Sequence, residues 1–136
     1  IKMKCFTPQI DYFEQDVFDS LSFSQIVEVG NTFYLSGIAP LKGSLENTLV
    51  MGQCIEEQLE FILTTAGKCL ECVGLGFSNI ANWTIYTTDI DAFANKSGEI
   101  LKKYLGQHKP VCTLVQISKL IHPEQMIEIT ITAVKE

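Results

Sequence analysis

The C-terminal segment, residues 110–135, constrains the fold most strongly, because it contains two runs with the two-residue period of β-strands. In the second run, Met126–Val134, alternate positions are apolar, namely Ile127, Ile129, Ile131 and Ala133. Successive side chains of a strand point to opposite faces of a sheet, so these residues share one face and Glu128 lies on the other. The first run, Val111–Ser118, predicts a second strand. A solvent-facing charge on a sheet with one open side is the simplest interpretation of Glu128.

Four further runs predict strands upstream of this segment. They are Met3–Phe6, Phe23–Val29, Thr32–Ser36 and Ile80–Thr88. Gly30-Asn31 separates two of them and is a strong two-residue hairpin signal. Gln9–Ser22 mixes acidic and aromatic residues and predicts an irregular segment that covers one side of the domain. Gly37–Gly43, which contains a proline between its glycines, predicts a loop.

Two runs have the periodicity of helices. The first is Asn47–Ala66, in which apolar residues recur at three- and four-residue spacing and form one stripe. This stripe consists of Ile55, Leu59, Ile62, Leu63 and Ala66. Gly67 is placed to end this helix, and the following Lys68–Gly74 is interpreted either as two added helical turns or as a longer loop. Ala92–Leu105 predicts the second helix.

The order of these elements is β-β-β-α-β-α-β-β, with no internal repeat and no linker. A chain of 136 residues can form one compact domain with a modest core, so residues 1–136 are interpreted as a single domain. Helices grouped on one face of a mostly antiparallel sheet are the natural layering for this order. The sequence therefore predicts an α+β fold with a six-stranded, mostly antiparallel sheet and two helices on one face.

The composition excludes several classes of partner. The chain is 46% hydrophobic and 19% charged, which is typical of a globular protein. Its net charge of −6 argues against a nucleic acid or an anionic membrane as partner, because neutralising phosphates requires clustered lysines and arginines. No apolar run reaches the ~18 residues that span a bilayer, and the N-terminal residues lack the apolar core of a signal peptide. We therefore predict a cytoplasmic location and no membrane partner.

The cysteines and histidines do not form a recognisable metal motif. Five cysteines are an odd number and predict free thiols. Cys69 and Cys72 have CxxC spacing, but a structural zinc site usually needs a second pair, and a redox CxxC belongs to a thioredoxin-like βαβ unit. We therefore predict no metal site and no redox site. His108 and His122 are interpreted as surface residues.

Short motifs along the chain carry a family resemblance. In order, they are Ser36-Gly37 with Pro40, Ala66-Gly67, Tyr86-Thr87-Thr88-Asp89 with Phe93, Pro110-Val111-Cys112-Thr113 with Leu120 and Pro123, and Ile127-Glu128-Ile129 with Ala133. This pattern covers nearly the whole chain and resembles the Rid proteins, the YjgF/YER057c/UK114 family. The resemblance implies a chorismate-mutase-like domain that assembles as a homotrimer.

The resemblance also implies a chemistry. Rid enzymes hydrolyse reactive enamines and imines, such as 2-aminoacrylate, to a 2-keto acid and ammonia, and they use no metal or organic cofactor. By resemblance, Glu128 is the candidate catalytic residue that positions or activates a water, while Ser36 and Gly37 help to hold the ligand in a cleft between subunits. An imine carbon is already electrophilic, so a general base, an oriented water and an anchor for the substrate carboxylate suffice.

The chain departs from the family pattern at other positions of this site. Cys112 stands where the family has the arginine that binds the substrate carboxylate, Phe23 replaces a tyrosine, and Ser97 replaces an asparagine. Cysteine cannot make the two charge-assisted hydrogen bonds of arginine. Each such bond contributes roughly 1.5–3 kcal/mol, so their loss weakens substrate binding by ~10²-fold or more. Cys112 is not favoured as a nucleophile, because a thiolate needs a nearby cation and Glu128 is an anion.

Three functions remain open. The first is a homotrimer that binds a small apolar or neutral ligand, or a protein partner, without catalysis. Its candidate ligand-binding residues are Phe23, Ser36, Gly37, Ser97 and Cys112. The second is a divergent enamine or imine deaminase that uses Glu128. The third is the endoribonuclease or translation-inhibitor role for which some relatives are named, and the acidic net charge argues against it.

Overall fold

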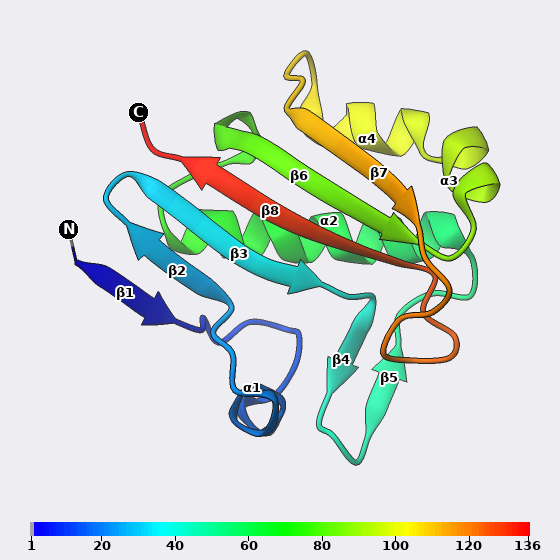
Figure 1. The fold of residues 1–136 in the computed structure, drawn as a ribbon, viewed down its shortest axis with the longest axis horizontal. Helices are drawn as coiled ribbons and strands as arrows, with labels where there is room; N and C mark the ends of the chain where they lie inside the picture. Colours follow the sequence, from blue (N-terminus) through cyan, green and yellow to red (C-terminus); the bar gives the residue numbers. More distant parts are fainter. Residues whose placement is uncertain (1) are drawn as a thin grey trace.

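The computed structural model describes residues 2–136, which form a six-stranded sheet with helices packed on one face (Figure 1). The strands of this sheet are β1 (Met3–Phe6), β2 (Ile26–Val29), β3 (Thr32–Ile38), β6 (Ile80–Thr87), β7 (Val111–Gln116) and β8 (Ile127–Val134). The helices are α1 (Gln15–Leu21), α2 (Ile55–Cys72), α3 (Ile90–Lys96) and α4 (Gly98–Leu105), with a 3-10 turn, η1, at Phe77–Asn79. A separate hairpin consists of β4 (Leu41–Gly43) and β5 (Thr48–Val50).

The strand order is β1-β2-β3-β8-β6-β7, so the C-terminal strand lies in the interior of the sheet. All neighbouring pairs are antiparallel except β6 and β7, which run parallel and are joined by α3 and α4. Strands β7 and β8 are consecutive in the sequence but not adjacent, because β6 lies between them. The predicted α+β class and the mostly antiparallel six-stranded sheet are confirmed.

The alternation in β8 determines how the sheet packs. Its apolar positions, Ile127, Ile129, Ile131 and Ala133, have at most 1% of their surface exposed. They join one core cluster with the apolar stripe predicted for the long helix, which α2 presents to the sheet. Complete burial of one branched apolar side chain stabilises a fold by ~1.5–3 kcal/mol. This layer between β8 and α2 is therefore a major source of stability.

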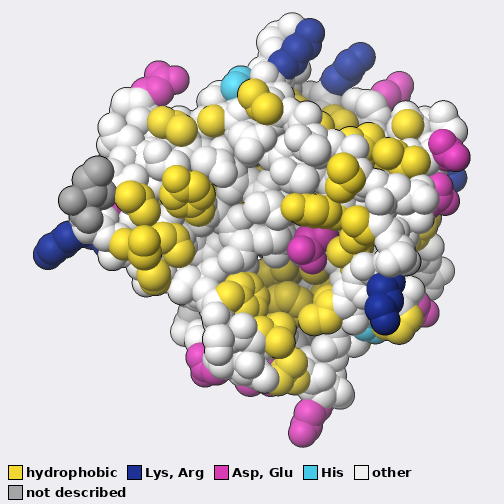
Figure 2. Space-filling view, viewed as in Figure 1, with side chains coloured by type: hydrophobic (Ala, Val, Ile, Leu, Met, Phe, Trp, Pro, Cys, Tyr) yellow, Lys and Arg dark blue, Asp and Glu magenta, His cyan; other side chains and the backbone are white. Residues whose placement is uncertain are grey.

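Among residues 2–136, no helix lies over the other face of the sheet in the ribbon of Figure 1, and Figure 2 shows the side chains on this side of the molecule. The strand register places Thr130 beside Thr84, and Thr132 beside Tyr34, in rows that cross the sheet. Tyr34 is 50% exposed, and Val111 at the edge of the same face is 68% exposed. An uncovered face that mixes threonines with large apolar side chains is suited to a protein contact.

The segment Gln9–Ser22 is not irregular throughout, as we predicted, because Gln15–Leu21 forms α1. The side chains of Val17 and Phe18 on this short helix are buried. The helix ends at Ser22, which has a φ of 57°. Two turns are too few for a clear helical period among the acidic and aromatic residues of this segment.

The predicted start of the long helix is wrong. The prediction covered Asn47–Ala66, but α2 begins at Ile55, because Thr48–Val50 pairs with Leu41–Gly43 in the β4–β5 hairpin. The hairpin also replaces the end of the loop predicted for Gly37–Gly43. The apolar stripe itself begins at Ile55, so the periodicity described α2 and not the residues before it.

The predicted helix ends also differ from the structure. Helix α2 continues through Gly67 to Cys72, so most of Lys68–Gly74 consists of added helical turns, one of the two interpretations left open. A Cβ atom at Gly67 would lie 3.2 Å from Cε2 of Phe77, so the glycine serves close packing and not chain termination. The predicted helix Ala92–Leu105 is divided into α3 and α4. Within residues 2–136, no helix is both long and apolar enough to cross a membrane.

Candidate functional site

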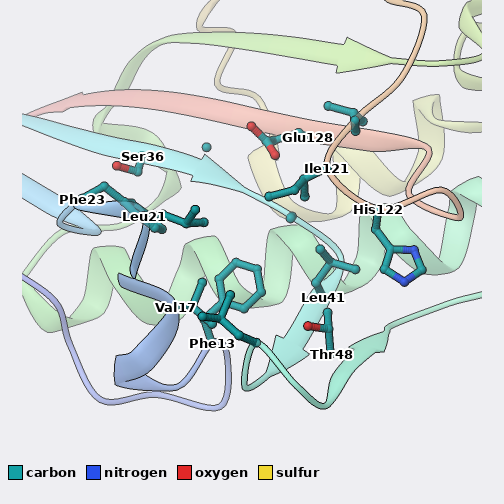
Figure 3. A pocket seen from close by; sticks show the side chains of 14 residues that line it. Phe13, Val17, Leu21, Phe23, Ser36, Leu41, Thr48, Ile121, His122 and Glu128 are labelled. Carbon is teal, nitrogen blue, oxygen red and sulfur yellow. The ribbon is translucent and has the colours of Figure 1, made fainter. Parts of the chain in front are cut away.

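A pocket of about 550 Å³ lies where the open face of the sheet meets α1 and the β4–β5 hairpin (Figure 3). The residues that line it come from distant parts of the chain. They are Phe13, Val17, Leu21, Phe23, Ser36, Gly37, Ala39, Leu41, Leu45, Thr48, Leu120, Ile121, His122 and Glu128. Four of the six residues predicted for the site, namely Phe23, Ser36, Gly37 and Glu128, therefore meet in one pocket.

The position of Glu128 depends on an irregularity in the neighbouring strand. The register between β3 and β8 shifts between Leu35 and Ile38, so Ser36 and Gly37 lie at a β-bulge opposite Thr130 in the middle of β8. A Cβ atom at Gly37 would overlap Oε2 of Glu128. Bulges re-aim side chains, and a glycine at this one leaves room for the carboxylate beside the backbone.

Gln125 fixes the orientation of Glu128, and we did not predict it from the sequence. Its side chain is 2% exposed, and its Nε2 donates to Oε1 of Glu128 at 3.2 Å and to the Ile127 carbonyl at 3.1 Å. Gln125 belongs to a polar loop before β8, where neither periodicity nor a motif distinguishes it. Its position three residues before Glu128 was the only available signal.

The environment of Glu128 favours its neutral form. Burial raises the pKa of the Glu128 carboxyl above its ordinary value, and the hydrogen bond from Gln125 partly offsets this rise. None of the residues that line the pocket is a lysine or an arginine, so no ammonium or guanidinium group of this lining lowers the pKa. His122 is the other titratable side chain of the lining.

The walls of the pocket are mainly apolar. Figure 3 shows Phe13, Val17 and Leu41 on the side opposite Glu128. The ring of Phe23 packs against Phe18 with 4.7 Å between centroids, which ties this wall to α1. The replacement of a tyrosine by Phe23 therefore removes a hydroxyl from an aromatic wall while its ring remains packed.

Ser36 is held by the two residues that precede β2. Its Oγ donates to the Ser24 carbonyl at 2.7 Å, and its own carbonyl accepts from Nε2 of Gln25 at 3.0 Å. Nearby, the Ala39 backbone N–H donates to the buried hydroxyl of Tyr12 at 2.9 Å. These bonds fix the segment on both sides of Gly37, so the bulge that receives Glu128 is preorganised.

Cys112 and Ser97 do not lie in this pocket. Cys112 pairs with Trp83 across β6 and β7, and the Trp83 side chain is in the core, so Cys112 belongs to the helix-covered face. Glu128 pairs with Tyr86 on the open face. Ser97 is buried at the junction of α3 and α4, in the helix layer. Within one chain the structure thus separates Cys112 and Ser97 from Glu128.

Burial raises the pKa of two of the thiols, Cys112 and Cys69. Partial burial raises the pKa of Cys112, and a hydrogen bond with Trp83 offsets part of the rise. Cys69 is buried, and its burial raises the pKa of its thiol to about 12, while Cys72 is exposed. His108 Nε2 lies 2.7 Å from the Ile80 carbonyl. Among residues 2–136, no three His, Cys, Asp or Glu side chains are grouped as metal ligands would be.

Comparison with known proteins places the chain in a family. Residues 16–135 match the family model described as Endoribonuclease L-PSP. A RutC family protein of Pyrococcus abyssi is 30% identical over 114 residues, which cover 84% of this chain and 87% of that protein. Protein DfrA of Myxococcus xanthus is 32% identical over 100 residues, which cover 72% of this chain and 74% of that protein.

Solved structures extend the similarity to almost the entire fold. A Thermotoga maritima protein named as a candidate endoribonuclease is 28% identical, with a TM-score of 0.82 and 98% of each chain covered. Rv2704 of Mycobacterium tuberculosis, described as a member of the YjgF/YER057c/UK114 family, has a TM-score of 0.81 at 20% identity and shares the fold over 98% of this chain and 100% of its own. The chain therefore belongs to the Endoribonuclease L-PSP family, the Rid or YjgF/YER057c/UK114 family predicted from its motifs.

Proposed function

We propose that this protein acts as a Rid-like homotrimer that binds a small, mainly apolar molecule in clefts between subunits, without standard 2-aminoacrylate deaminase activity. One observation carries the proposal: the pocket around Glu128 retains the carboxylate and the Ser36-Gly37 bulge but has no lysine or arginine in its lining. A 2-imino acid would bring its own carboxylate next to Glu128 with nothing to neutralise it. Like charges this close disfavour binding.

The separation of the predicted site residues supports a cleft between copies. Cys112 lies on the edge strand β7, and the Glu128 pocket opens on the other face of the sheet. In a closed ring, each copy would bring its β7 edge toward the pocket of the next copy, so every cleft would contain both. The rim of the pocket is suited to such a contact, because Leu21, Leu45 and Ile121 are 48%, 48% and 68% exposed.

A divergent enamine or imine deaminase is the second candidate. The observation that favours it is the pairing of Glu128 with Gln125, because a carboxyl with a raised pKa and a fixed orientation suits a general base near neutral pH. Such an enzyme would act on a substrate that lacks a carboxylate. The endoribonuclease role named in the family description has less support, because RNA binding needs cations and the pocket lining has none.

Sedimentation at micromolar concentration tests the assembly. We expect a trimer of the 15.2 kDa chain, and a stable monomer would contradict the proposal. Tyr34→Asp should raise the dissociation constant of the trimer by at least ~10-fold, because it places a charge on the uncovered face of the sheet. Leu49→Asp is the matched control, since Leu49 is similarly exposed, at 55% against 50%, but belongs to the β4–β5 hairpin. Equal effects of the two substitutions would show that the open face is not the contact.

A further inference from the structure

The charge of the pocket carries information about the class of its ligand. The chain contains no arginine at any of its 136 positions, and its 10 basic residues are all lysines. A homo-oligomer adds only further copies of the same chain, so assembly cannot bring a guanidinium from these residues into the pocket. Two lysines are also engaged elsewhere, since Lys42 pairs with Asp11 at 3.3 Å and Lys103 pairs with Glu60 at 2.8 Å.

The shape of the pocket specifies the rest of the ligand. A volume of about 550 Å³ is within the range of small-molecule sites. Phe13, Val17 and Leu41 form an apolar wall opposite Glu128 (Figure 3). One side of the pocket is therefore apolar, and the other side carries the Glu128 carboxyl, which can form hydrogen bonds. Gly37 and Glu128 both line the pocket, and the space left by the missing side chain at Gly37 holds the Glu128 carboxylate at the pocket surface.

We propose that this pocket binds a hydrophobic primary amine, with its N–H donors on the Glu128 carboxylate and its apolar body against Phe13 and Leu41. The inference deepens the proposed function and rests on it. A protonated amine supplies the cation that the pocket lacks and keeps Glu128 ionised. A hydrogen bond between charged groups corresponds to roughly 10- to 100-fold in affinity. A ligand carboxylate would meet Glu128 as a second anion, so the pocket selects against it.

Four probes of similar size separate charge from shape. They are 2-phenylethylamine, 2-phenylethanol, 3-phenylpropanoate and phenylalanine, each titrated by calorimetry at neutral pH. We expect the amine to bind at least ~10-fold more tightly than the alcohol, and the two carboxylate-bearing probes to bind more weakly than the alcohol. A lysine from a partner copy is the alternative source of positive charge in the pocket. If 3-phenylpropanoate binds as tightly as the amine, the inference is overturned and the partner lysine is supported.

The variant Glu128→Gln isolates the counter-ion. It should remove the preference for the amine over the alcohol while leaving the affinity for 2-phenylethanol within ~3-fold. Glu46→Gln is the matched control, because it removes the same charge next to the rim residue Leu45 but does not line the pocket. An amine preference that survives Glu128→Gln, or that both variants reduce equally, would overturn the inference.

The same titrations distinguish this inference from the proposed function. Binding of 2-phenylethanol without any preference for the amine would overturn the amine class but leave a pocket for an apolar ligand. Binding of none of the four probes would overturn the amine class as well. In that case the sedimentation of the protein shows separately whether the proposed assembly also fails.

Discussion

Gly37 lies against the carboxylate of Glu128, and a methyl group at position 37 would overlap Oε2 of that residue. The contact joins the bulge in β3 to the start of β8, and it explains how a carboxylate is accommodated at the edge of an apolar core. Glycine is required here for space, since a positive φ is not what distinguishes this residue.

Replacement of this glycine should be costly. Gly37→Ala forces Glu128 or the bulge to move, and overpacking of this kind destabilises by about 1–3 kcal/mol. Denaturant unfolding measures the change. Gly98→Ala is the control, because an added Cβ there meets nothing within 4 Å and the residue starts α4. Equal stabilities of the two variants would show that the contact between positions 37 and 128 is not tight.

The pKa of Glu128 predicts a pH-dependent effect on stability. Because burial raises this pKa above its ordinary value of 4.5, the native state holds the proton more tightly than the unfolded chain does. The stability that Glu128 contributes is therefore fully present below the unfolded pKa and is lost as pH rises through the folded pKa. Glu128→Gln does not titrate, so its stability relative to wild type should increase as the pH rises above the ordinary pKa of 4.5.

Unfolding curves of both proteins at several pH values measure this difference. Glu46→Gln, which removes a carboxyl at an exposed position, is the control for the loss of one negative charge. A flat difference between Glu128→Gln and wild type would contradict the burial of an ionisable group at this site.

Gln125 should control the ionisation of its neighbour. Gln125→Leu removes the hydrogen bond that stabilises the ionised carboxylate, so the pKa of Glu128 should rise further. It also leaves the Ile127 carbonyl without its side-chain donor, which costs about 1–3 kcal/mol. Carbon-13 NMR titration of the carboxyl measures the pKa. Gln107→Leu, at an exposed position, should leave the pKa of Glu128 unchanged. If Gln125→Leu also leaves this pKa unchanged, Gln125 does not control the ionisation of Glu128.

Restoring an arginine tests whether Cys112 reaches the pocket of a partner. Cys112→Arg should tighten pyruvate or 2-oxobutyrate binding by at least ~10-fold, because a guanidinium offers two charged hydrogen bonds to a carboxylate. Cys112 and Glu128 lie on opposite faces of the sheet of one chain, so the gain in affinity depends on assembly. It should therefore disappear in the double variant that combines Cys112→Arg with Tyr34→Asp. Cys72→Arg adds the same charge at an exposed position and is the control. Unchanged keto-acid binding in an intact trimer would mean that position 112 does not line the cleft.

The sequence was sufficient to predict those elements that are long enough to repeat their apolar pattern several times. The alternation in β8 and the stripe in α2 gave the two layers of the core, since both patterns follow from burial on one side. The β4–β5 hairpin and α1 were missed because three-residue strands and a two-turn helix are too short to show a period. Pairing with distant residues, and not local preference, determines these elements.

The candidate site also contains some residues that could be predicted from the sequence and others that could not. Glu128 and Ser36-Gly37 could be identified because they match motifs of the family, whereas the interruption of an apolar strand by Glu128 indicated only a solvent-facing charge. Gln125 could not, because its role depends on a hydrogen bond that forms only after the loop folds back on β8. The separation of Cys112 from Glu128 follows from β6 lying between β7 and β8, which the order of strands along the chain does not reveal.

The most direct test of the central claim is the rate of keto-acid formation from 2-aminoacrylate, generated in the assay by an amino-acid dehydratase. The pocket has a carboxylate but no lysine or arginine in its lining, so we expect a rate indistinguishable from the uncatalysed hydrolysis in the absence of the protein. An arginine-containing family member, assayed at the same concentration, provides the positive control. A rate equal to that of the control would contradict the account, because it would show that this cleft binds the substrate carboxylate without an arginine.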